Sequence, residues 1–315
     1  MIEWTSLSNE PLQFENYIPA GFAGVSMPEA VIASAKGKFG RLTFQSIVNP
    51  DFCFQYSVVD LLTPLTVMGR CSLEGLYTRI VLESHINHDF KNADDIYIRE
   101  GQFSMALANK LEARIQYPRA RAYSSFDACF SLDMVNRLLP FYPTAARFFE
   151  VGISARPYIL ISAPRAAGAE TELIIENILH EPRNEKNAEL LLVNLFAHLE
   201  KDQAYKSPGQ DVLNNIYAVE ELIAENIRKH YLLPELARRA NTNACYLKKY
   251  FPWIFGVSPY QYLVRLRMRQ AKRFLKSGLS VKVTAKQCGY SSTAEFSKAF
   301  KKVVKVSPEK FRNGD

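Results

Sequence analysis

The hydrophobic positions along the chain follow two periods. In the first 125 residues, runs rich in β-branched and aromatic residues, such as 40–48 and 76–82, are separated by turn formers. Such runs predict short strands, and their regular spacing favours a β-barrel or a β-sandwich. From about Ser131 the apolar residues recur every three or four positions, which predicts helices. Ser131 can cap a helix that runs through Leu139 and is stopped by Pro140.

Two further helices are predicted over residues 170–180 and 186–203. The second helix presents a broad apolar face, formed by Leu191, Leu192, Leu195, Phe196 and Leu199. Such a face packs either into the core of its own domain or against a second copy of the chain, and we expect the core. A homodimer through residues 170–203 is the alternative.

A break in the pattern divides the chain into two domains. Residues 204–211 contain Ser207-Pro208-Gly209, which interrupts the helical period. We therefore predict a first domain over 1–206, a linker over 207–211 and a second domain over 212–315. A length of 315 residues agrees with two cores. The expected fold class is multidomain α+β, with a strand-rich domain and flanking helices followed by an all-α domain.

An internal repeat runs through the second domain. Tyr246-Leu-Lys-Lys-Tyr-Phe251 and Gly256-Val-Ser-Pro259 correspond to Glu295-Phe-Ser-Lys-Ala-Phe300 and Lys305-Val-Ser-Pro308, at an offset of 49. Upstream of these segments the offset is 48, so the length difference lies in a turn, where it disturbs the fold least. Two helical copies of this size, each with a tight turn, are typical of a pair of helix-turn-helix modules.

The turn of the second module can be assigned from local residue preferences. Ser280 can cap a short helix that ends near Cys288, and Gly289 can supply the positive φ of the turn. Ser291 or Ser292 then caps the recognition helix.

The two recognition helices have distinct inner and outer faces. Phe296 and Phe300 in the second helix, and Leu247 and Phe251 in the first, are spaced to face the core. The outward positions are candidates for contacts in a DNA groove: Asn243, Ala244, Cys245, Lys248 and Lys249 in the first module, and Ser292, Thr293, Ala294, Ser297, Lys298 and Lys301 in the second.

A long helix is predicted between the modules. Ser258-Pro259 provides a cap followed by a proline in the first turn. The helix carries Arg265, Arg267 and Lys272, which we expect to position the DNA backbone through phosphate contacts.

The charge is divided unevenly between the domains. Residues 211–315 contain 20 Lys and Arg against 8 Asp and Glu, a net charge of +12, whereas residues 1–210 contain 19 against 24, a net charge of −5. A basic domain of this kind favours a polyanionic partner, because neutralised phosphates release condensed counterions. Charge alone does not distinguish DNA from RNA or a membrane surface, so the distinction rests on the duplicated helix-turn-helix pattern.

The second domain also contains a series of recognisable motifs: Glu235-Leu-Ala-Arg-Arg-Ala240, Tyr246-Leu-Lys-Lys-Tyr-Phe251, Gly256-Val-Ser-Pro259, Tyr262-Leu-Val-Arg-Leu-Arg267, Gly289-Tyr-Ser291, Phe296-Ser-Lys-Ala-Phe-Lys301 and Val306-Ser-Pro308. With them, residues 212–312 resemble the DNA-binding domain of the AraC/XylS family of transcription regulators. The resemblance implies seven helices, with two helix-turn-helix modules joined by a long helix, and double-stranded DNA as the partner. It implies for the first domain a cupin-like β-barrel followed by helices.

Three positions depart from the family pattern. Leu232 stands where a Ser or Thr cap is usual, with Pro234 just inside the helix, and a lost cap costs about 1 kcal/mol. Pro252 lies in the last half of the first recognition helix and should kink or end it, at about 3 kcal/mol. Lys305 replaces a glycine after the second recognition helix, which costs about 1 kcal/mol if φ is positive there.

The resemblance also implies regulation by a small-molecule effector, an inclination toward activation, and RNA polymerase as a further partner. Five aromatic residues of the first domain, Phe39, Phe44, Phe52, Phe54 and Tyr56, are expected in its core, and an effector pocket among them is the alternative. The hypothesis for the second domain is that its recognition helices enter successive major grooves, about 34 Å apart.

Other classes of protein fit less well. The chain has five histidines, and only His85 and His88 form a pair in the first domain, so we expect no metal site, no cofactor and no enzyme. A sequence-neutral, architectural DNA-coating protein is the second alternative. No apolar run approaches the length of about 20 residues that a bilayer requires. The start Met1-Ile-Glu-Trp is not that of a signal peptide, and the five scattered cysteines suit a reducing compartment, so we expect the cytoplasm.

Overall fold

The computed structural model describes residues 3–6, 12–71, 74–90, 96–108, 111–154, 159–161, 164–201 and 210–313. Its contacts divide the chain into two compact units, Met1–Lys206 and Ser207–Asp315. Most of the predicted linker lies outside the described residues, and its last two positions already belong to the first helix of the second unit.

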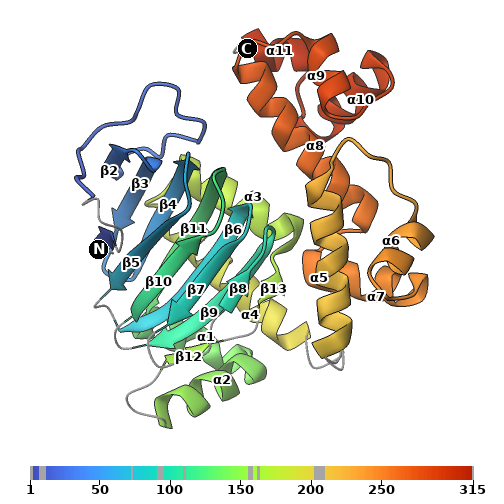
Figure 1. Ribbon diagram of the computed structural model, residues 1–315. Coiled ribbons are helices and arrows are strands. Elements are labelled where there is room, and N and C mark those ends of the chain that lie inside the picture. The colour runs from blue at the N-terminus through green and yellow to red at the C-terminus, as the bar shows by residue number, and fades with distance from the viewer. Residues whose placement is uncertain are drawn as a thin grey trace. The chain divides into compact units, whose positions relative to one another are not determined.

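The N-terminal unit contains two antiparallel sheets (Figure 1). The larger sheet has the order β12 (Ile159–Ile161), β9 (Gln102–Ala108), β6 (Gly75–Glu83), β11 (Ala122–Ser131), β4 (Phe52–Leu61), β3 (Gly40–Val48) and β2 (Val31–Gly37), with β13 (Arg165–Ala166) also paired to β9. The smaller sheet has the order β1 (Glu3–Ser6), β5 (Leu65–Cys71), β10 (Leu111–Tyr117), β7 (Ile86–Phe90) and β8 (Ile96–Ile98). The strand-rich character is confirmed. The described pairings do not close the strands into a barrel, so the cupin-like barrel is not confirmed.

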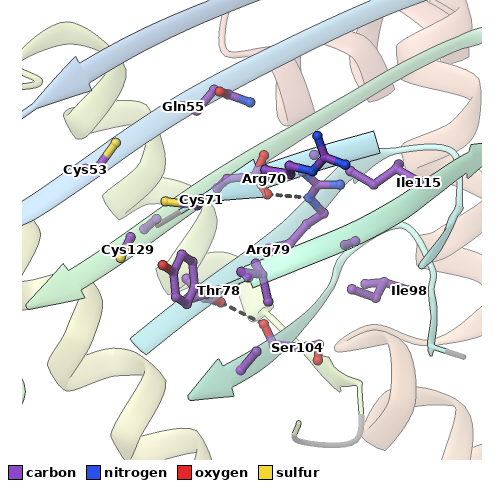
Figure 2. Close-up of a pocket in the computed structure, with 17 residues that line it drawn as sticks. Cys53, Gln55, Arg70, Cys71, Thr78, Arg79, Ile98, Ser104, Ile115 and Cys129 are labelled. Carbon is purple, nitrogen blue, oxygen red and sulfur yellow. Dashed lines mark hydrogen bonds and ion pairs between the residues drawn. The ribbon is translucent and has the colours of Figure 1, made fainter. Parts of the chain in front are cut away.

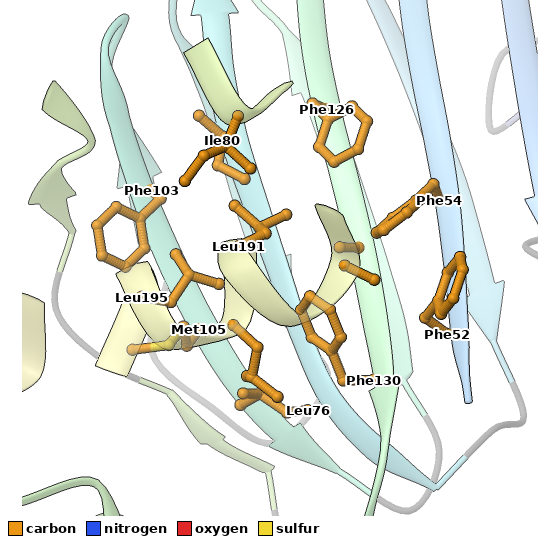
Figure 3. Close-up of a cluster of buried hydrophobic side chains, with 14 of the residues drawn as sticks. Phe52, Phe54, Leu76, Ile80, Phe103, Met105, Phe126, Phe130, Leu191 and Leu195 are labelled. Atoms are coloured by element: carbon orange, nitrogen blue, oxygen red, sulfur yellow. The ribbon is translucent and has the colours of Figure 1, made fainter. Parts of the chain in front are cut away.

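The larger sheet is buried on both faces, and strand β4 shows how. Successive side chains of a strand point to opposite faces. Cys53 and Gln55 line a cavity whose other walls include strands of the smaller sheet (Figure 2). Phe52 and Phe54 lie on the opposite face, in a core shared with Leu191 of the helical layer (Figure 3). Burial on both faces explains why nine of the ten β4 residues are not exposed.

Helices cover the outer face of the larger sheet. They are α1 (Leu132–Leu138), the 3₁₀ turn η1 (Leu139–Phe141), α2 (Pro143–Ser154), α3 (Gly168–His180) and α4 (Glu185–Lys201). The predicted cap is confirmed, because the Ser131 hydroxyl accepts a hydrogen bond from the Met134 amide at 3.1 Å. The apolar face of α4 is used by the core of its own unit, where Leu191, Leu195 and Phe196 are fully buried. The core interpretation of that face is therefore confirmed, and the same side chains are not exposed for a dimer.

The C-terminal unit consists of helices. They are α5 (Gln210–Glu225), α6 (Leu233–Arg239), α7 (Ala244–Phe255), α8 (Pro259–Lys276), α9 (Val281–Gln287), α10 (Thr293–Val304) and α11 (Pro308–Asn313). Two separate apolar cores lie along α8. Tyr262 and Leu263 from its first half pack with Phe251 of α7, and Met268 and Ala271 from its second half pack with Phe296 of α10. Each predicted module therefore has a core of its own.

Helix α8 begins as the sequence predicts. Ser258 and Gln261 form a reciprocal capping box, and Pro259 occupies the first turn. Such a start fixes where the long helix begins and therefore where the first module ends.

Pro252 is expected to kink or end the first recognition helix, and the second of these outcomes is wrong. Helix α7 continues past Pro252 to Phe255, and its C-cap is Gly256. A proline in a helix costs about 3 kcal/mol, whereas full burial of one large apolar side chain contributes about 1.5–3 kcal/mol. Ile254 and Phe255, which follow the proline, are both buried in the first core, and their burial outweighs the local penalty.

No helix in the described part of the chain is long and apolar enough to span a bilayer.

Candidate nucleic-acid interface

The recognition helices α7 and α10 start with the same geometry. The side chain of Asn243 accepts a hydrogen bond from the Tyr246 amide at 2.8 Å, and Ser292 accepts one from the Glu295 amide at 3.1 Å. Both caps have extended backbone angles. Of the two serines considered for the second cap, Ser292 fills the role. Because the cap engages the side-chain oxygen of each residue, Asn243 and Ser292 offer their remaining polar groups to a partner.

The inner faces of the two helices are confirmed. Leu247 and Phe251 of α7, and Phe296 and Phe300 of α10, are completely buried in the two cores. Phe296 and Phe300 also contact each other, with ring centroids 5.6 Å apart. These contacts fix the rotation of each helix about its axis, so the opposite face of each helix points outward.

The outer faces carry most of the predicted contact residues. Ten of the fourteen candidates are exposed: Asn243, Cys245, Lys248, Lys249, Lys272, Ser292, Thr293, Ala294, Lys298 and Lys301. Ala244, Arg265 and Ser297 are half-buried. The exposed lysines of α7 and α10 give both recognition helices a positive outer surface, which suits a phosphate backbone or the acceptor atoms of guanine.

One exposed aromatic group on α7 was missed by the sequence analysis. Tyr246 is 45% exposed, and its ring contacts that of Tyr250 at 5.8 Å. The ammonium of Lys249 lies 4.8 Å from the centroid of the Tyr250 ring. Tyr246 adds an apolar surface with a polar tip next to the lysines. An aromatic residue in a helix is assigned to the core by default, so only the structure shows that this one faces outward.

The prediction that Arg267 contacts phosphate does not fit its position. Arg267 is 6% exposed, and its guanidinium donates hydrogen bonds to three backbone carbonyls in the segment after α5. Basic residues occur at every second position of this part of α8. Because the helical period is 3.6 residues, some of these basic residues lie on the inner side of the helix. Arg267 is one of these, whereas Lys272 is exposed.

The recognition helices α7 and α10 end with the same C-cap geometry. Gly256 and Lys305 have φ values of +71°, and their amides donate to the carbonyls of Pro252 and Lys301. The condition for a penalty at Lys305, a positive φ, is therefore met. Gly289 also has the predicted positive φ, +77°.

The N-terminal unit contains a second candidate site, a cavity of about 60 Å³ between strands of its two sheets. Figure 2 shows Cys53, Cys71 and Cys129 together at one end of the cavity. Cys53 and Cys129 are opposite one another on adjacent strands. Burial raises the pKa of the Cys53 thiol to about 11, and that of Cys129 well above its usual range. Both groups are therefore neutral thiols and poor nucleophiles at neutral pH.

Polar groups of this cavity have partners within the protein. Arg79 pairs with Asp127 at its wall, and the Thr78 hydroxyl donates to the Ser104 carbonyl at 3.1 Å. The five aromatic residues expected in the first domain are all buried, as predicted, in apolar clusters. None of them lines this cavity, so these aromatic residues do not form the pocket that was the alternative to a core.

The expected histidine pair is only partly described. Burial, together with Arg121 and Arg99, lowers the pKa of His85 to about 4. The side chain of His88 lies outside the described residues. Among the residues that the structure describes, no group of three or more potential metal ligands is arranged to hold an ion.

Comparison with known proteins identifies the C-terminal unit. A family model described as a helix-turn-helix domain matches residues 236–314. The uncharacterised HTH-type transcriptional regulator YisR of Bacillus subtilis is 24% identical over 153 residues, which are 48% of this chain and 53% of YisR. The lactose operon transcription activator of Staphylococcus xylosus is 30% identical over 105 residues, 33% of this chain and 38% of that protein. The DNA-binding domain of AdpA, solved in complex with a target DNA, is 25% identical and covers 32% of this chain and 92% of that domain, with a TM-score of 0.31.

The C-terminal unit therefore contains a helix-turn-helix domain, in agreement with the AraC/XylS resemblance of its motifs. The chain spans about half or less of the length of the curated relatives it matches.

Proposed function

We propose that this protein is a sequence-specific DNA-binding regulator of transcription. The observation that carries the proposal is the pair of recognition helices, each capped at its start, packed on its inner face and lined with exposed lysines on its outer face. The net charge of +12 in residues 211–315 supports binding to a duplex, since each neutralised phosphate releases counterions. The proposal includes the insertion of α7 and α10 into successive major grooves, about 34 Å apart.

Within this proposal the exposed residues divide into two groups. Lys248, Lys249 and Lys298 point away from the cores near the starts of α7 and α10, where they reach base edges or phosphates. Lys272 lies on the helix between the modules and contacts only the backbone. Residues of the first group determine which sequence is bound, and those of the second determine only how tightly.

The test is the binding of duplex DNA selected by the full chain from a random pool, measured by fluorescence anisotropy over a range of salt concentrations. Lys298→Ala should weaken binding by about 1–3 kcal/mol and relax the preference at one base position. Lys310→Ala removes the same charge from α11, outside both recognition helices, and is the matched control; it should leave the preferred sequence unchanged. If the wild-type chain selects no sequence at all, it is a sequence-neutral, architectural DNA-coating protein.

We further propose that the cavity between the two sheets is the site of an effector. Its volume of about 60 Å³ holds roughly four to six water-sized groups, and polar side chains such as Gln55, Arg70 and Arg79 already have partners within the protein. A small, uncharged and largely apolar molecule fits these walls. Benzene and isobutanol are suitable probes in a thermal unfolding assay. Both should raise the Tm of the wild type but not that of Ala106→Met, which fills the cavity; equal shifts in the two proteins would place the binding elsewhere.

Activation rather than repression, contact with RNA polymerase and a homodimer through residues 170–203 are also part of the proposal. If a dimer forms, the exposed side chains of α3 and α4, such as Leu173 and Leu190, are available to it. Transcription from a selected site in a purified system decides the sign of regulation, and sedimentation at several concentrations decides the oligomeric state.

A further inference from the structure

The two modules of the C-terminal unit have separate cores, which raises the question of what fixes their mutual orientation. Helix α8 runs through both cores, but a single helix can bend. A DNA reader with two recognition helices needs more than this, because one base pair changes the position of a groove by about 3.4 Å and about 34°.

A second connection joins the modules through Arg267. Its Nε donates to the Ile227 carbonyl at 2.7 Å, and one terminal nitrogen donates to the carbonyls of Arg228 and Lys229, each at 3.2 Å. These carbonyls belong to the segment that follows α5, in the first module. Three charge-assisted hydrogen bonds from one planar group fix a direction as well as a distance.

The same segment also contacts the turn of the second module. A Cβ placed on Gly289 would lie 2.5 Å from the Arg228 carbonyl oxygen and 2.6 Å from its Cα, so only a glycine permits this approach. The next residue, Tyr290, has its ring centroid 5.2 Å from the Arg267 guanidinium carbon and 5.5 Å from the Phe296 centroid. Phe296 belongs to α10 and is fully buried in the second core. A continuous series of contacts therefore runs from the end of α5 to the second recognition helix.

We propose that Arg267, Gly289 and Tyr290 form a clasp that holds α7 and α10 at a fixed separation and angle, so that the protein distinguishes sites by the spacing between their two halves. Arg267 is thus a positioning residue for DNA recognition, buried against protein and not in contact with the duplex. This inference rests on the proposed function, since it concerns how two recognition helices bind the same DNA duplex.

The experiment compares three duplexes. The first is a site selected by the wild-type chain from random DNA, and the other two carry one base pair inserted or removed between the two footprinted halves. The wild type should bind each altered duplex at least about tenfold more weakly, because a one-base-pair shift misplaces the contacts of one module. Arg267→Ala should bind the selected site more weakly but should discriminate among the three duplexes by less than about threefold, because the modules can then adjust independently.

Two further variants make the result specific. Lys272→Ala removes a charge from the exposed side of the same helix and should weaken binding to all three duplexes equally, leaving the spacing preference intact. Arg267→Lys keeps the charge but loses the planar group with its several donors, so it should also lose discrimination; if Arg267→Ala does not fold, as judged by its circular dichroism spectrum, Arg267→Lys carries the test.

The outcomes separate the two proposals. A wild-type chain that selects no site refutes the proposed function. The clasp alone is refuted if the wild type selects a site and a folded variant, Arg267→Ala or Arg267→Lys, keeps the full spacing preference.

Discussion

The two C-caps of the recognition helices allow one backbone effect to be measured twice in the same domain. Gly256 and Lys305 occupy equivalent positions of the repeat, and both have a φ of +71°. The left-handed conformation costs a residue with a Cβ about 1–2 kcal/mol. Glycine avoids this cost but loses about 0.4–1 kcal/mol more on folding, because its unfolded chain is more flexible. The difference favours glycine by about 0.5–1 kcal/mol at either position.

The charge of Lys305 has to be separated from its backbone. A lysine near the C-terminus of a helix is stabilised by the helix dipole by about 0.3–1 kcal/mol. The informative comparison is therefore Lys305→Gly with Lys305→Ala, in which both variants have lost the charge and only one keeps the Cβ. We expect Lys305→Gly to be the more stable of the two by about 0.5–1 kcal/mol, and Gly256→Ala to be less stable than the wild type by the same amount.

The assay is urea unfolding of the full chain followed by the helical circular dichroism signal, with thermal unfolding as a second measure. A change of 1 kcal/mol corresponds to a Tm shift of about 4–8 °C in a domain of this size. Equal stability of the two Lys305 variants, or a Gly256→Ala chain as stable as the wild type, would refute the assignment of the strain to positive φ.

Three further predictions follow from local chemistry. Leu232 leaves helix α6 without a side-chain cap, so Leu232→Ser should stabilise the chain by about 1 kcal/mol in urea unfolding, and Ser280→Ala at the equivalent position should destabilise it by a similar amount. The pKa of His85 is lowered from its usual 6.5 to about 4, so between these values the unfolded chain binds more protons, and stability should fall as the pH drops through this window. His85→Gln should reduce that fall between about pH 7 and pH 5, and a fall of unchanged size would assign it to other groups. Cys245 is exposed on α7, whereas Cys288 is buried, so N-ethylmaleimide should modify Cys245 first and weaken DNA binding. DNA binding by the Cys245→Ser variant should not be weakened by the reagent.

Much of the C-terminal unit could be predicted because its signals are local. The sequence predicts the caps at Ser258 and Ser280 and the positive φ at Gly289, because each depends on residues within one or two turns. The repeat shows the same signals twice, once in each module. The same local reasoning failed at Pro252, because the packing of the residues that follow it is a tertiary effect.

The features that could not be predicted depend on contacts between distant segments. Arg267 reads as one of several basic residues on an exposed helix, yet its partners lie 38–40 positions earlier in the chain. The alternation along β4 predicts two faces but does not show which one meets the helices and which one meets the second sheet. For that reason the aromatics were considered as a pocket, whereas Cys53 and Gln55 on the other face line the cavity.

The distribution of local defects gives the clasp a second role. The first module carries the uncapped Leu232 and the interior Pro252, at about 1 and 3 kcal/mol, whereas the second carries only the strained Lys305, at about 1 kcal/mol. The first module therefore depends more on tertiary packing to offset its local penalties. Arg267 lies beyond the first core along α8 and bonds to carbonyls at the end of α5, so it stabilises the module with the larger local deficit. Its side chain is committed to that task, and within the proposed function the contacts to DNA fall to the exposed lysines of the outer faces.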